Sequence, residues 1–107
     1  MPPQKDFHHP DLSDVSIYQA MQALTDPCRV AIILALSGDS NREFACNEID
    51  LDMKLSKATV SHHFKTLREA GIIHTRAEGR SCLSSIRLKE FEQRFPGLLA
   101  LVLNENR

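Results

Sequence analysis

The stretch LSKATVSHHFKTLREAG, residues 55–71, has the pattern of one amphipathic helix with a marked start and end. Ser56 is a favourable N-cap, because its hydroxyl can accept a hydrogen bond from a backbone N–H two or three residues later. Gly71 is favourable just past the helix, since glycine adopts the left-handed conformation there at little cost. The apolar residues recur at i, i+4 and i+7 and so share one stripe: Val60, Phe64 and Leu67.

The opposite face of this predicted helix is short, polar and cationic. Together with the helix start it comprises Ser56, Lys57, Ala58, Thr59, Ser61, His62 and Lys65. Hydroxyls, an imidazole and lysines are groups that reach base edges and phosphates in a DNA major groove. A face selected only for solubility would favour Glu, Lys and Gln over Ser, Thr and His. The pattern therefore favours DNA contact over a solvated face, while His63 is expected to pack near the apolar stripe.

Length and composition are those of one ordinary globular domain: 107 residues, of which 42% are hydrophobic and 25% charged. No apolar run approaches the ~20 residues that span a bilayer, and the first residues lack the apolar core of a signal peptide. We therefore expect a cytoplasmic protein with no membrane partner. The three cysteines are odd in number and widely spaced, which argues against a disulfide framework.

The formal net charge of −1 hides an uneven distribution. Residues 54–87 carry seven basic and two acidic side chains and so a charge of +5, while the rest of the chain carries six basic and twelve acidic ones and a charge of −6. A cationic third on an acidic body fits a polyanion. It also predicts that any DNA affinity falls steeply with salt.

Ahead of the quoted stretch, the first twelve residues are rich in proline and histidine and have little periodicity. We interpret 1–12 as a flexible arm and 13–107 as one domain. Ser13 is a candidate N-cap for a first helix over about 14–24, whose apolar surface is broader than one stripe.

A second helix is predicted from Pro27 to about Leu36, with Asp26 as its N-cap and proline at the first helical position. It is apolar on nearly all sides and should therefore be the buried centre of the domain, with Cys28 nearer the surface. A short third helix is expected over about 44–50.

After Gly71, residues 72–76 and 81–88 have strand patterns separated by a turn at 77–80. A hairpin placed directly after a DNA-facing helix is a wing. Arg76 at its base and Arg80 at its tip would reach a minor groove or flanking phosphates, the alternative being simple solubility. The predicted fold is thus mainly α with a small β-hairpin, a winged helix-turn-helix in the order α-α-α-α-β-β-α.

The chain ends in a helix over 89–95, a Pro96-Gly97 break and the dense apolar run LLALVL at 98–103. Such a surface is costly in water. We expect the helices near 14–24 and 89–103 to pair in a two-fold dimer, which would place two recognition helices on a palindromic site. The residues predicted in this interface are Tyr18, Met21, Leu98, Leu99 and Val102.

A resemblance to a known family is carried by three segments: ALTDPCRVAIILAL (23–36), SKATVSHHFKTLREAGII (56–73) and GRSCLSSIRL (79–88). Over roughly residues 17–103 the chain resembles the ArsR-type (arsenic-repressor-like) transcriptional regulators. The resemblance implies a homodimeric repressor that binds double-stranded DNA, with dimer contacts from the first and last helices. It also implies an inducer, often a metal ion, that lowers operator affinity.

The metal-site motifs of that family have no counterpart in this sequence. The resemblance places the Cys-x-Cys pair of its arsenic, cadmium and lead sensors at Ala45 and Asn47, around Cys46. The Asp and His ligands of its zinc and nickel sensors are missing too, since 88–107 contains no His, Cys or Asp. The chain thus looks like a branch without these motifs; we predict no metal site and no cofactor, and the inducer stays unknown.

Two alternatives stay open. One is a thiol-responsive regulator of the same fold that acts through Cys28 or Cys46. The other is a winged-helix interaction module whose basic face docks an acidic protein. The sequence contains neither a nucleophile–base pattern nor a phosphate-binding glycine loop, so no catalytic residues are predicted.

Overall fold

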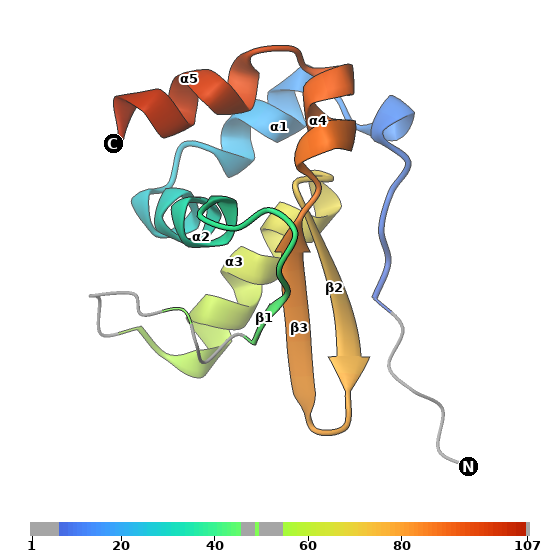
Figure 1. Ribbon diagram of the computed structural model, residues 1–107, viewed down its shortest axis with the longest axis vertical. Coiled ribbons are helices and arrows are strands. Elements are labelled where there is room, and N and C mark those ends of the chain that lie inside the picture. Colours follow the sequence, from blue (N-terminus) through green and yellow to red (C-terminus); the bar gives the residue numbers. More distant parts are fainter. Residues whose placement is uncertain (1–6, 46–48, 50–54, 107) are drawn as a thin grey trace.

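The computed structural model describes residues 7–45, 49 and 55–106 (Figure 1). Its elements, in chain order, are η1 (Leu12–Asp14), α1 (Ile17–Ala23), α2 (Pro27–Ser37), β1 (Phe44–Ala45), α3 (Lys57–Glu69), β2 (Ile73–Glu78), β3 (Ser81–Ile86), α4 (Leu88–Arg94) and α5 (Leu98–Glu105). In Figure 1, α1 and α5 lie at one end of the long axis and the β2–β3 turn at the other. This arrangement confirms the predicted winged helix-turn-helix fold.

Helix α2 begins as the sequence predicts. Asp26 is its N-cap, and Oδ1 of that carboxylate accepts hydrogen bonds from the backbone N–H groups of Cys28 and Arg29 at 2.8 and 3.3 Å. Pro27 occupies the first turn, where its missing N–H costs nothing. The helix contributes Ile32, Ile33 and Leu36 to the core, each with no exposed surface, so it is the buried centre of the domain.

Helix α3 has both predicted ends. The Ser56 hydroxyl accepts from the Thr59 backbone N–H at 3.1 Å. At the other end Gly71 has φ 75°, and the N–H groups of Gly71 and Ile72 donate to the carbonyls of Arg68 and Leu67. This is the Schellman arrangement, which satisfies carbonyls that the helix leaves unpaired. Phe64 and Leu67 are buried, as the apolar stripe predicts.

The wing is part of a three-stranded antiparallel sheet in the order β1-β3-β2. The predicted helix over 44–50 is wrong at its start, because Phe44 and Ala45 form β1 and pair with Ser84 and Leu83 of β3. The reason is that β3 would otherwise have an open edge whose backbone groups need partners. Except for Ile49, the remainder of that predicted helix lies outside the described residues.

The first predicted helix is divided into two pieces. Asp11, not Ser13, caps η1, and Ser16 caps α1 by accepting from the Gln19 N–H at 3.1 Å. Ser13 is wrong as a helix cap because the backbone returns to an extended conformation at Val15, whose side chain is buried in the core. Only part of the broad apolar surface of this region serves the core, because Val15 and Leu24 are buried whereas Ile17, Tyr18 and Met21 are exposed.

Residues 7–12 of the predicted flexible arm lie against the body of the protein. The Thr75 N–H donates to Nε2 of His9 at 2.9 Å, and the His9 and His74 rings stack with centroids 4.2 Å apart. Arg87 donates to the Pro10 carbonyl, and the Leu12 side chain is buried. The rest of the arm, 1–6, lies outside the described residues.

At the C-terminal end, Pro96 and Gly97 separate α4 from α5, and Gly97 has φ 82°. Phe91 of α4 and Leu99 of α5 are fully buried. Among the described residues no single helix is long and apolar enough to cross a membrane, although α1 and α2 together meet that criterion across a 92° bend.

Candidate nucleic-acid interface

The outward face of α3 is as open as the sequence predicts. All seven residues assigned to it are exposed: Ser56, Lys57, Ala58, Thr59, Ser61, His62 and Lys65. The Lys65 ammonium lies 3.9 Å from Glu69 in a loose i,i+4 pair, with 64% of its side chain exposed. Such surface pairs contribute little and leave the charge available to a phosphate.

The side chains of these residues differ in their hydrogen bonding. The Ser56 hydroxyl is occupied by its cap and lies 2.9 Å from Oγ1 of Thr59. The side chains of Ser61 and His62 make no hydrogen bond to another residue of the described part of the chain. Ser56 and Thr59 are therefore suited to holding the start of α3, whereas Ser61 and His62 are available to a base edge.

The tip of the wing faces the start of α3. Gly79 and Arg80 form a tight turn between the paired residues Glu78 and Ser81, with φ 58° at the glycine. A hollow of about 490 Å³, which we call the α3–wing hollow, brings both elements together. Its lining residues are Ala45, Leu55, Lys57, Val60, Ser61, Arg80, Ser81 and Cys82. Arg80 is thus brought to the same hollow as Lys57 and Ser61.

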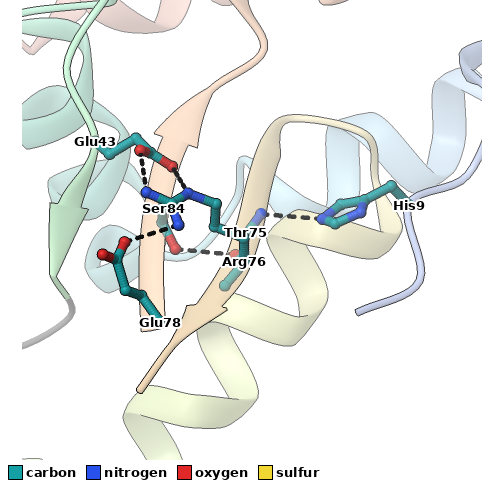
Figure 2. A network of polar contacts seen from close by, with 6 residues as sticks. All are labelled: His9, Glu43, Thr75, Arg76, Glu78 and Ser84. Carbon is teal, nitrogen blue, oxygen red and sulfur yellow. Dashed lines mark hydrogen bonds and ion pairs between the residues drawn. The ribbon is translucent and has the colours of Figure 1, made fainter. Parts of the chain in front are cut away.

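Arg76 is placed differently from Arg80. Its guanidinium donates to both carboxylate oxygens of Glu43, at 2.7 and 2.8 Å, and lies 2.7 Å from Glu78 (Figure 2). The hydrogen bond to Glu43, followed by that to Glu78, raises the pKa of Arg76, and the same bond lowers the pKa of the Glu43 carboxyl. Two carboxylates therefore compete with any phosphate for Arg76, a contact that the sequence did not reveal.

The cationic stretch 54–87 does not form one surface. Arg68 stacks over the Phe7 ring, 4.5 Å from its centroid. Arg87 donates to the Pro10 carbonyl and to Glu90, and only 12% of its side chain is exposed. The charge count of the sequence therefore overstates the positive potential of the interface. Lys54 lies outside the described residues.

Of the predicted dimer residues, Tyr18 and Met21 of α1 are 79% and 49% exposed. Leu98 and Val102 are half-buried, and Leu99 is a correction: it has no exposed surface because it packs in the core of its own chain. Two further apolar residues, which the predicted interface did not include, are also exposed: Leu101, at 71%, and Ile17. The helical period of α5 points Leu101 away from the side that carries Leu99.

Cys28 is buried and forms no disulfide, which corrects the expectation that it lies near the surface. Burial, with the charge of Asp26 and a hydrogen bond to it, raises the pKa of the Cys28 thiol. A reactive cysteine needs the opposite, a stabilised thiolate, so this environment weighs against the redox hypothesis for Cys28. Cys46, the other candidate, lies outside the described residues.

His63 packs on the buried side of α3, as expected, and meets Arg29 of α2. Nη1 of Arg29 lies 3.2 Å from Nδ1 of His63, while the same guanidinium donates to the carbonyls of Ala23 and Gln22. Arg29 thus ties the end of α1, the start of α2 and the middle of α3 together. The sequence gives no signal for this contact, because its partners are 34 residues apart.

Comparison with known proteins agrees with this geometry. The family model for the bacterial regulatory proteins of the arsR family matches residues 26–75, from the cap of α2 into β2. The chain is similar to the uncharacterized HTH-type transcriptional regulator YceK of Bacillus subtilis strain 168, with 42% identity over 81 aligned residues. The alignment covers 76% of this chain and 80% of YceK. The chain belongs to the ArsR family. It is therefore a DNA-binding transcriptional regulator.

Solved structures share the fold of this ArsR-family protein. An ArsR family transcriptional regulator, RHA00566, superposes with a TM-score of 0.64 at 22% identity, covering 84% of this chain and 91% of that one. The transcriptional repressor BigR from Xylella fastidiosa gives a TM-score of 0.56 at 22% identity, covering 73% and 78%. At this identity the likeness extends to the architecture alone.

Proposed function

We propose that this ArsR-family protein is a repressor that binds a palindromic operator as a homodimer. The observation that carries the proposal is the juxtaposition of the exposed face of α3 with Arg80 across the α3–wing hollow. We use the name α3–wing edge for the exposed face of α3 together with Arg80, that is, for Ser56, Lys57, Ala58, Thr59, Ser61, His62, Lys65 and Arg80. A helix and a hairpin tip on one side of a protein fit a major groove and the flanking backbone of one duplex.

In this proposal α3 lies in the major groove. Its 13 residues make a rod about 20 Å long and, with side chains, about 10–12 Å across, and this diameter fits a groove about 12 Å wide. Ser61, His62 and Lys65 contact base edges or phosphates, and Ala58 contacts a thymine methyl group. Lys57 and Arg80 bind phosphates on either side, while Ser56 and Thr59 hold the helix start. Arg76 contributes less because Glu43 and Glu78 already bind it.

The partner in the proposed homodimer is a second copy of the chain, which covers an apolar patch on α1 and α5. We call this the α1–α5 patch, made of Ile17, Tyr18, Met21 and Leu101. Ile17 and Leu101 line one shallow hollow of about 520 Å³, so the two helices form a continuous surface. A two-fold axis there would repeat α3 on two half-sites. The structural neighbour BigR is a transcriptional repressor, and repression by this chain is proposed by analogy with it.

Selection from a random duplex library with the full-length protein tests this function. We expect a two-fold symmetric site, bound at least about 1,000-fold more tightly than a scrambled duplex. His62→Ala should weaken binding to the selected site by about 10-fold, near the lower end of the loss expected for one base contact, and leave the circular dichroism spectrum unchanged. Lys89→Ala, at an exposed residue of α4 away from the α3–wing edge, is the matched control.

Equal affinity for selected and scrambled duplexes would overturn the proposal and favour an interaction module that binds acidic proteins. Light scattering on the same samples measures the oligomeric state separately. The cytoplasmic location stays a prediction of the sequence, the thiol response through Cys28 or Cys46 stays an alternative, and the inducer is unknown.

A further inference from the structure

Three potential metal ligands meet where α2 begins beside α3. The ligand atoms of Asp26, Cys28 and His63 all lie within 4.8 Å of one another. Cys28 and His63 are only 9% and 7% exposed, and Asp26 is half-buried. The cluster joins the cap of one helix to the middle of the next. Its residues come from two separate segments, which is why the sequence did not predict it.

The Cys28 thiol carries a proton that a metal ion can replace. Its sulfur and a carboxylate oxygen of Asp26 lie within 4.8 Å of each other. Both backbone bonds of the Asp26 cap end on Oδ1, so the cap needs only one of the two oxygens. A cation between sulfur and oxygen would keep these two groups together while the helix cap stays in place.

The imidazole of His63 has the form that a metal requires. A guanidinium has only donor groups, so Nδ1 of His63 accepts the contact from Arg29 at 3.2 Å. If the ion took this lone pair, Arg29 would lose one partner. It would keep its bonds to the carbonyls of Ala23 at 2.8 Å and Gln22 at 3.1 Å.

We propose that Asp26, Cys28 and His63 form a binding site for a thiophilic divalent cation of the Zn²⁺ class. On binding, the Cys28 proton leaves for solvent and a metal–sulfur bond forms. The thiolate and the carboxylate then balance the two charges of the ion. One sulfur, one nitrogen and one oxygen ligand suit Zn²⁺, and a water completes four-fold coordination. The site is distinct from the Cys-x-Cys position of the family, which falls on residues 45–47.

Such an ion would connect metal availability to DNA binding, a consequence that rests on the proposed function. His63 follows His62 directly on α3, so a bond to His63 acts on the helix that carries the α3–wing edge. Arg29 also belongs to α2, so the ion would replace one tie between α2 and α3 by another of different geometry and would thereby reposition α3 on α2. We therefore expect the ion to weaken DNA binding by about 10-fold, within the usual 5- to 150-fold range of such coupling.

Titration of the full-length protein with Co²⁺ tests the site without DNA. We expect one equivalent to bind, with a sulfur-to-cobalt charge-transfer band and visible bands of tetrahedral cobalt, and with Zn²⁺ displacing both. Cys28→Ser should abolish the charge-transfer band. His63→Gln should keep a charge-transfer band but weaken Co²⁺ binding at least about 10-fold, by analogy with losses seen around metal sites.

The chain offers matched controls for each ligand. Cys82→Ser and Cys46→Ser test the other thiols, and His62→Gln tests the neighbouring imidazole; all three should bind Co²⁺ like the unmodified protein. Asp26→Asn retains a good helix cap and therefore separates ligand loss from unfolding. A charge-transfer band that survives Cys28→Ser but disappears in Cys82→Ser or Cys46→Ser would overturn the site.

Binding of the metal-free protein to its selected duplex, with and without Zn²⁺, then tests the coupling. A 10-fold loss of affinity that is absent in Cys28→Ser supports it. Cobalt binding with unchanged DNA affinity would overturn the coupling but not the site. If the metal-free protein fails to bind any duplex specifically while the cobalt spectrum appears, the proposed function is the part that fails.

Discussion

The α3–wing edge and the α1–α5 patch are both exposed, yet their chemistry is opposite. The first presents hydroxyls, imidazole and cations, whereas the second presents Tyr18, Met21 and Leu101 on two helices. They lie toward opposite ends of the long axis in Figure 1. One end therefore suits a polyanion, and the other suits an apolar surface.

This difference has a direct physical consequence for how each surface would bind. Phosphate contacts release counterions, so affinity at the α3–wing edge should fall steeply with salt. Burial of apolar area is nearly insensitive to moderate salt, so pairing through the α1–α5 patch should persist. Substitutions at the two ends should accordingly separate two measurements, affinity for DNA and affinity between copies of the chain.

The largest effect is expected from Leu101→Asp in the α1–α5 patch. Leu101 is 71% exposed, so the substitution should not disturb the fold of one chain. In a dimer it would bury an unpaired carboxylate, which costs several kcal/mol. We expect the dimer dissociation constant, measured by sedimentation equilibrium, to rise at least about 100-fold, or about 2.8 kcal/mol.

Asn104→Asp is the control for that experiment, because it adds the same charge at another exposed position of α5. The dimer dissociation constant of Asn104→Asp should lie within a few-fold of that of the unmodified protein. An unchanged dimer in Leu101→Asp would move the interface away from the α1–α5 patch.

A second comparison concerns the glycines beside these two regions. Gly71 follows α3 and Gly97 precedes α5, and both have positive φ. A Cβ at Gly71 would run into the buried Leu12 side chain, whereas at Gly97 it would meet open space. Strain at positive φ costs about 1–2 kcal/mol in either case, and displacing Leu12 adds to it at Gly71.

We therefore expect Gly71→Ala to lower the free energy of unfolding by about 2–3 kcal/mol and Gly97→Ala by about 1 kcal/mol. Urea denaturation followed by circular dichroism measures both. Equal losses in the two variants would show that Leu12 adapts without cost.

How much the sequence could predict depends on the range of the interaction. Caps and stripes are local, so Asp26, Ser56 and the buried side of α3 followed from spacing alone. Strand β1 did not, because Phe44 finds its partner 40 residues later at Ser84. The bond between Arg76 and Glu43 was not predicted for the same reason, since the two residues are far apart in the sequence. Leu99 was predicted from its spacing to contact a partner chain, but it is buried in the core of its own chain. Only the tertiary contacts decide such cases.

Arg80 and Arg76 offer a smaller but sharper test within the wing. Arg80 lies at the α3–wing hollow, and Arg76 is bound by Glu43 and Glu78. We expect Arg80→Ala to weaken binding to specific and non-specific duplexes alike by a few-fold. It should also reduce the slope of the logarithm of the DNA-binding constant against the logarithm of the salt concentration by about one. Arg76→Ala should leave that slope nearly unchanged. Fluorescence anisotropy over a salt series measures both, and equal slopes would reject the distinction between the two arginines.

The smallest effect should come from His9, which contacts the outer strand β2 and belongs to neither region (Figure 2). Nε2 of His9 accepts a bond from the Thr75 N–H, so the folded state needs the unprotonated ring at that atom. Burial, followed by the nearby His74, Arg87 and Arg68, lowers the pKa of His9 below its ordinary 6.5.

Because the folded pKa lies below the unfolded one, the unfolded chain takes up its proton first as the pH falls. The contribution of His9 to stability is therefore complete above about pH 6.5 and decreases as the pH falls from there toward the folded pKa. We expect the melting temperature of the unmodified protein to drop more between about pH 7.5 and 5.5 than that of His9→Asn. His8→Asn, at the exposed neighbouring residue, should keep the full drop. If the melting temperature of His9→Asn falls as much as that of the unmodified protein, the contact between His9 and β2 does not stabilise the wing.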